Sequence, residues 1–160
     1  MRVETHRYRV GTVRPNTKYA RSEIDEMATI GILSLAATLG AMLFFAVAVA
    51  PTVFQALPAE QAGLFLRRLF PRYYAALILG STAAGVLLLP TEPSAAGVCL
   101  SVAIATLWVR QSLVPKINQL RDKELAGDAL AGVHFARWHR ISVVINLIQL
   151  VALAALLAVL

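Results

Sequence analysis

The chain has little of what a soluble or disulfide-bonded domain requires. Only 15% of its 160 residues are charged, whereas soluble domains carry about 25%. The single cysteine, Cys99, excludes an intrachain disulfide and lies in an apolar stretch, where it serves as a small hydrophobic side chain. The basic residues do not cluster in a polar folded domain, so the composition argues against a nucleic-acid partner.

The sequence also lacks the side chains on which common catalytic mechanisms depend. Its long apolar stretches contain no carboxylate. Paired-carboxylate catalysis and proton-coupled pumping both need an acid, which would have to lie within those stretches. There is no glycine-rich phosphate loop and no nucleophile beside a base. We therefore expect a protein that is not an enzyme.

What the chain does contain is apolar residues in long runs. Hydrophobic residues make up 58% of the sequence, and the mean hydropathy is +0.67. About 20 apolar residues suffice to cross the hydrocarbon core of a bilayer as a helix. The runs predict an all-α bundle of four transmembrane helices, with Pro51 ending the first and Pro115 ending the third. The expected spans are residues 29–50, 73–89, 95–114 and 140–160.

Two polar segments are expected outside the spans. Residues 1–28 form a polar, basic N-terminal arm ahead of a transmembrane domain of residues 29–160, and Arg7, Arg9 and Arg14 of this arm are candidates for contact with partners or lipid. Residues 59–70 predict an amphipathic helix at the membrane interface, between the first and second spans. Its Arg67 and Arg68 are expected to reach the lipid headgroups.

The deepest polar side chains of the last span share one helical face. His139, Ser142, Asn146 and Gln149 recur at helical spacing in an otherwise apolar run. Polar groups inside a bilayer face protein or water rather than lipid. With four spans, these residues lie at the same membrane side as Tyr73, Tyr74 and Arg110, so we expect a polar site there.

Each of these residues has more than one interpretation. His139 is a heme or metal ligand, a proton carrier, or an interfacial histidine bonded to a neighbouring backbone group or tyrosine. Asn146 and Gln149 either join helices by hydrogen bonds or line a pocket. Arg110 is expected either to extend its guanidinium group to the membrane interface or to pair with Asp122 or Glu124, and contact with an anion is the alternative. Because the first three spans contain no histidine, no cofactor is predicted.

Two short motifs give the chain a family resemblance. They are residues 69–74 (Leu-Phe-Pro-Arg-Tyr-Tyr) and residues 135–142 (Phe-Ala-Arg-Trp-His-Arg-Ile-Ser), followed by Asn146. The segments 49–54 and 114–117 match the same pattern. In these residues the chain resembles the transmembrane protein 205-like family, a domain of unknown function with four membrane spans. Many members carry a histidine near the start of the first span, where this chain has Gly31.

These observations lead to a functional expectation. The leading hypothesis is an accessory or structural subunit of a larger membrane complex, with the lipid bilayer and other membrane subunits as partners. The alternative is a membrane protein that handles heme, a metal or a small molecule on the His139, Ser142 and Asn146 face. Basic residues are more numerous near the longer connections, which the positive-inside rule places on the cytoplasmic or matrix side of a bacterial or organelle inner membrane.

Overall fold

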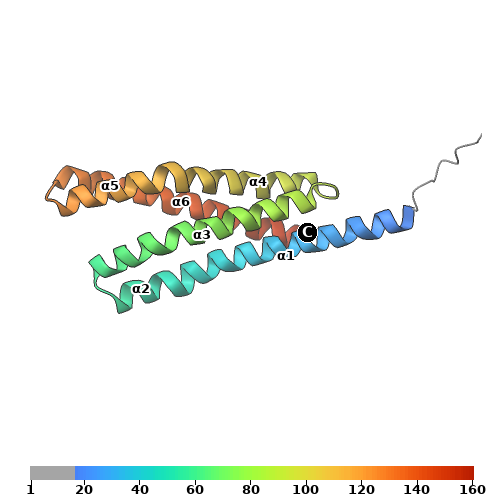
Figure 1. Ribbon diagram of the computed structural model, residues 1–160, viewed down its shortest axis with the longest axis horizontal. Helices are drawn as coiled ribbons and strands as arrows, with labels where there is room; N and C mark the ends of the chain where they lie inside the picture. The colour runs from blue at the N-terminus through green and yellow to red at the C-terminus, as the bar shows by residue number, and fades with distance from the viewer. Residues whose placement is uncertain (1–16) are drawn as a thin grey trace, which may run out of the picture.

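The computed structural model of the protein describes residues 17–160, and its elements are helices arranged as two long hairpins. The first hairpin comprises α1 (Thr17–Phe44), the π-helical turn η1 (Phe45–Val49), α2 (Ala50–Ala56) and the returning helix α3 (Ala59–Leu88). The second comprises α4 (Pro93–Trp108), the π-helical turn η2 (Val109–Leu113), α5 (Val114–Leu125) and the returning helix α6 (Ala129–Val159). The α2–α3 and α5–α6 turns lie at one end of the bundle, and the α3–α4 turn and the C-terminus lie towards the other (Figure 1).

Three helices in the described range are long and apolar enough to cross a membrane. They are Lys18–Ala56, Pro93–Leu125 and Ala129–Val159. The all-helical fold predicted from the sequence is confirmed. The returning helix α3 is outside this group because its apolar part begins only after Arg72.

The prediction that Pro51 and Pro115 end their helices is wrong. Each proline is the second residue after a π-helical turn, and the helix continues to Ala56 or to Leu125. In these turns the Ala50 amide donates to the Phe45 carbonyl and the Val114 amide donates to the Val109 carbonyl. In each of these wider turns an amide donates to the carbonyl five residues earlier instead of four. The change in pattern comes just before a proline, which has no amide hydrogen to donate.

The interfacial helix predicted at residues 59–70 does not exist as a separate element. It is the first part of α3, which continues without a break through Pro71. Ala62 and Leu66 in this part pack against Val53 of α2, while the second part of α3 packs against α1 and α4. Packing on both sides of Pro71 holds the two parts in one helix, although Pro71 has no amide hydrogen to donate to the carbonyl of residue 67.

The last helix begins earlier than the expected boundary at residue 140. Gly127 has a φ of 101°, a backbone conformation that glycine adopts without strain, and it closes the turn after α5. The Asp128 carboxylate then accepts a hydrogen bond of 3.0 Å from the Ala131 amide and caps α6. At the other end of the chain, residues 17–28 of the expected arm form the first turns of α1.

Glycines allow α3 to lie close to both of its neighbours. A Cβ added to Gly80 would collide with the Thr38 hydroxyl of α1. A Cβ added to Gly85 would lie 2.7 Å from Leu100 Cγ and 3.2 Å from the Ala96 carbonyl oxygen of α4. Close approach through small residues is the usual way in which membrane helices gain packing energy.

We predict that Gly85→Ala destabilises the bundle, because the new methyl group has no room against α4. Overpacking of this kind costs about 1–3 kcal/mol. The matched control is Gly97→Ala, since a Cβ at Gly97 meets nothing within 4 Å and alanine is the better helix former. Thermal unfolding in detergent should give a lower melting temperature for Gly85→Ala and an unchanged or higher one for Gly97→Ala. Equal melting temperatures would contradict this packing.

Candidate functional site

A pocket of about 380 Å³ lies between the two hairpins, near the end where the α2–α3 and α5–α6 turns are found. Most of its wall is apolar, with contributions from α1, η1, α2, α3, α5 and α6. Five of the seven predicted site residues line it: Tyr73, Tyr74, His139, Ser142 and Asn146. The structure therefore brings together two motifs that are more than 60 residues apart in the chain, and the pocket volume is within the range of small-molecule sites.

The polar side of the pocket is a ladder along α6. The Ser142 hydroxyl donates to the His139 carbonyl oxygen at 2.7 Å, and the Asn146 side-chain amide donates to the Ser142 carbonyl oxygen at 3.0 Å. Tyr74 of α3 lines the same pocket as Asn146 of α6. These bonds leave the Asn146 carbonyl oxygen and the lone pairs of the Ser142 hydroxyl as acceptors for a further donor.

An aromatic cluster forms the facing side. Phe45 of η1 stacks on Tyr73 of α3 with ring centroids 4.5 Å apart, and Phe70 stacks on Tyr74 at 5.4 Å. The two tyrosines were predicted from the sequence to lie at the site, whereas Phe45 and Phe70 were not. Phe45 belongs to the π-helical turn before Pro51, and such turns are frequent at functional sites.

Gln149 faces a different neighbour from the other polar residues of α6. It is buried, and its side-chain amide lies 3.2 Å from the Thr106 hydroxyl and 3.4 Å from the Val102 carbonyl oxygen of α4. Of the two interpretations of Gln149, the structure favours the hydrogen bond between helices. Its partner Thr106 was not identified from the sequence.

The ion pairs differ from those expected. Among the described residues Asp122 pairs with Arg67 at 2.7 Å and Glu124 pairs with Arg121 at 2.7 Å. Pairing with either acid, one of the two expectations for Arg110, is therefore wrong, and its extension to the membrane interface stays a prediction. Arg67 also donates to the Asn118 carbonyl oxygen at 3.2 Å. Its guanidinium group therefore connects α3 to α5 beside the pocket, instead of extending only towards lipid.

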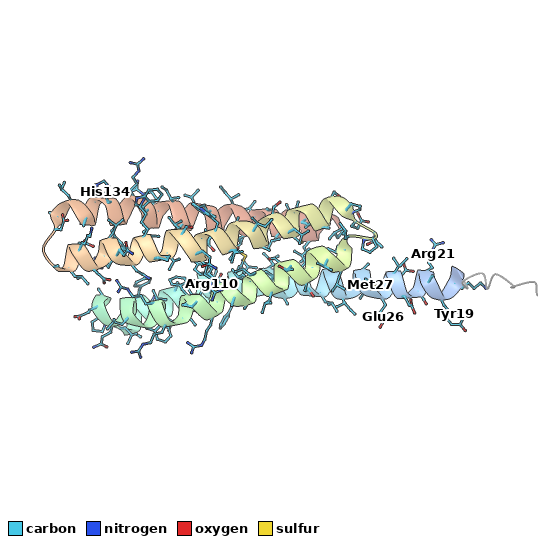
Figure 2. The ribbon with its side chains drawn as sticks, turned by 45° about the horizontal axis from the view of Figure 1, so that its top comes forward. Tyr19, Arg21, Glu26, Met27, Arg110 and His134 are labelled. Atoms are coloured by element: carbon cyan, nitrogen blue, oxygen red, sulfur yellow. The ribbon has the colours of Figure 1, made fainter. Side chains whose placement is uncertain are left out.

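Arg110 does not line the pocket. It lies in η2, part-way along the bundle where α4 continues into α5 (Figure 2). His139, by contrast, lines the pocket, and its ring stacks on the Phe135 ring with centroids 5.7 Å apart. The Arg121 guanidinium carbon lies 5.2 Å from the centroid of the same Phe135 ring. A second cation, Lys116, lies 3.7 Å from the Trp138 ring. Both contacts join α5 to the start of α6 by cation–π attraction.

The remaining predicted contacts are placed as follows. Arg68 is exposed on α3, whereas Arg7, Arg9 and Arg14 lie outside the described residues. Within residues 17–160 there is no group of three or more histidine, cysteine or acidic side chains that could hold a metal ion. His134 is exposed near the α5–α6 turn (Figure 2) and does not line the pocket.

We predict a measurable coupling between Gln149 and Thr106, tested by a double-mutant cycle with Gln149→Leu and Thr106→Val. Interhelical hydrogen bonds in membrane proteins contribute about 0.6 kcal/mol on average. Unfolding in a denaturing detergent should therefore give a coupling energy of about 0.5–1.5 kcal/mol. The control cycle pairs Gln149→Leu with Ser101→Ala, since the Ser101 hydroxyl bonds within α4 to the Gly97 carbonyl oxygen. Additive effects in the first cycle would show that Gln149 does not bond to Thr106.

A match to a known family runs from α1 to just beyond the end of α5. Neither a curated protein nor a solved structure matches the chain. Residues 33–126 match the sequence model of a family described as a domain of unknown function (DUF4149), a match that includes the aromatic side of the pocket but not the polar ladder of α6. Because this match covers more than half of the 160 residues, the chain belongs to the DUF4149 family.

Proposed function

We propose that this protein is a membrane protein that binds a small molecule in the pocket between its two hairpins. The observation that carries this proposal is the convergence of His139, Ser142 and Asn146 with Tyr73 and Tyr74 on a pocket of about 380 Å³. A mostly apolar wall with a few convergent polar groups is the usual composition of a ligand site. This is the small-molecule form of the alternative derived from the sequence, and it requires neither heme nor metal.

The proposal can be tested by photolabelling the purified protein in detergent with a neutral phenyl diazirine, followed by peptide mapping. Adducts should concentrate on the pocket-lining peptides of η1, α3 and α6, several-fold above those on the exposed Ile104 of α4. Asn146→Phe fills the pocket and should reduce these adducts several-fold. Adducts on Ile104 should stay unchanged.

The control variant is Ile148→Phe, which adds a similar side chain on the outer face of the same helix. Ile148 is exposed and does not line the pocket, so its substitution should leave the labelling pattern as in the wild type. Circular dichroism of both variants shows whether they fold. Equal labelling of pocket and surface peptides in the folded wild-type protein would refute a binding pocket.

The same proposal places four helices across the membrane. α3 packs along α1 and α4, two of the helices that are long enough to cross. A helix between two spanning neighbours lies in the same apolar surroundings. Its large exposed apolar side chains Leu79 and Val86 suit lipid contact. The end with Arg67, Arg68, Arg72, Lys116 and Arg121 would then face the cytoplasm of a bacterium or the matrix of an organelle.

We expect cysteines at Gln55 and Ala126 to be on one membrane side and a cysteine at Glu92 to be on the other. All three positions are exposed, and they lie in or beside the three turns between long helices. In a Cys99→Ser background, a membrane-impermeant maleimide should label Glu92→Cys in intact spheroplasts. Gln55→Cys and Ala126→Cys should react only after permeabilisation. Labelling of Gln55→Cys and Glu92→Cys from the same side would show that α3 does not cross.

A second candidate function is that of an accessory subunit of a membrane complex, which was the leading hypothesis from the sequence. The first turns of α1 favour it, because they project beyond the bundle (Figure 1). Tyr19, Arg21, Glu26 and Met27 are exposed on this projecting segment (Figure 2). Cross-linking from a photoreactive residue at position 19 in cells would capture such a partner, and the absence of a specific cross-linked band would count against this role.

A further inference from the structure

Along its length the pocket changes from polar to apolar, as one leaflet of a bilayer does from its headgroups to its acyl chains. Its polar groups, His139, Ser142 and Asn146, lie towards the end with the hairpin turns, and Leu147 and Leu150 follow deeper along α6. From His139 to Leu150 the helix rises about 16 Å. The pocket is therefore long in the direction of the lipid chains, with hydrogen-bonding groups at its outer half and hydrocarbon at its inner half.

The pocket also opens towards the lipid between the first hairpin and α6. Three lining residues on this side are large, apolar and exposed: Phe54 (61%), Val143 (51%) and Leu147 (58%). Lining residues on the other side, such as Leu66, Ile117 and Tyr74, are buried. The Arg67–Asp122 ion pair joins α3 to α5 beside them. A molecule dissolved in the bilayer reaches the pocket through the exposed side without crossing a polar surface.

The charge of the pocket restricts what can occupy it. With His139 neutral, none of the described residues that line it carries a charge. An anionic or cationic headgroup would be buried there with no oppositely charged side chain among the residues that line the pocket, which is costly. A hydroxyl group, in contrast, can donate to the Asn146 carbonyl oxygen or to Ser142.

On the basis of the proposed function, we infer that the pocket takes up a neutral, single-chain amphiphile with a hydroxyl-bearing headgroup directly from the lipid phase. The headgroup lies against Ser142 and Asn146. The apolar chain extends along Leu147 and Leu150 towards Met42. Ring faces of Tyr73 and Phe45 pack against the first part of the chain.

The test uses a monoacylglycerol that carries a diazirine in its acyl chain, incorporated in phosphatidylcholine vesicles with the full-length protein. Photolysis should give adducts on the pocket-lining peptides of η1 and α6. Val143→Trp narrows the opening and should reduce these adducts several-fold. The matched control is Val144→Trp: Val144 is the next residue, is similarly exposed (47%) and does not line the pocket, so its substitution should leave labelling unchanged.

A smaller change, Val143→Phe, repeats the test if the tryptophan variant does not fold. A fatty acid with the same chain and diazirine, kept ionised at alkaline pH, measures the effect of headgroup charge. It should label the pocket several-fold less than the monoacylglycerol does. Equal labelling by the two probes would overturn the neutral headgroup, and equal effects of the Val143 and Val144 substitutions would overturn entry from the lipid.

Failure of this inference is distinguishable from failure of the proposed function. If the phenyl diazirine labels the pocket in detergent but the monoacylglycerol does not label it in vesicles, the pocket binds a small molecule that is not a lipid-phase amphiphile. If neither probe labels the pocket in the folded protein, both proposals are wrong.

Discussion

Hydrogen bonding of the backbone inside hydrocarbon is the constraint on which the rest of this structure depends. A bilayer core offers no water to unpaired amide and carbonyl groups, so each crossing segment has to remain helical. The chain contains Pro51 and Pro115 within two long helices, where an unmodified α-helix would lose a hydrogen bond and clash with the ring. A π-helical turn ends two residues before each proline, and both helices continue.

The first of these turns contributes directly to the pocket. Phe45 and Ala46 of η1 line it, and the Phe45 ring stacks on Tyr73, while Val114, directly after η2, lines it as well. Towards the α3–α4 turn, Gly80 and Gly85 instead let α3 approach α1 and α4 until no further side chain fits between them. The bundle is therefore tightly packed at one end and encloses a pocket at the other, with Arg67 and Asp122 joining the hairpins there.

Polar side chains in this bundle have two separate roles, although they recur on one helix. Gln149 is buried and joins α6 to α4 through Thr106 and the Val102 carbonyl oxygen. One turn earlier, Asn146 bonds back to the Ser142 carbonyl oxygen and retains acceptor capacity towards the pocket. The two side chains point in slightly different directions around the axis of α6. Gln149 points towards α4 and has a structural role, whereas Asn146 points towards the pocket and is available to a ligand.

The sequence by itself determined the helical class, the approximate position of each long helix and the polar face of α6. These features follow from local composition and periodicity, because apolar length and side-chain spacing are properties of a single segment. The convergence of His139 with Tyr73 could also be anticipated, since counting four spans places both at the same membrane side. What could not be predicted was how the helices continue or pair.

Only the tertiary structure decided that α3 is one helix through Pro71, because contacts on both sides of that proline outweigh its local preference. Tertiary packing likewise assigned Asp122 to Arg67 rather than Arg110, and Gln149 to Thr106 rather than to the pocket. These partners are about 40 to 55 residues apart in the chain. Their pairing depends on how two hairpins lie against each other, a relation that no local sequence pattern contains.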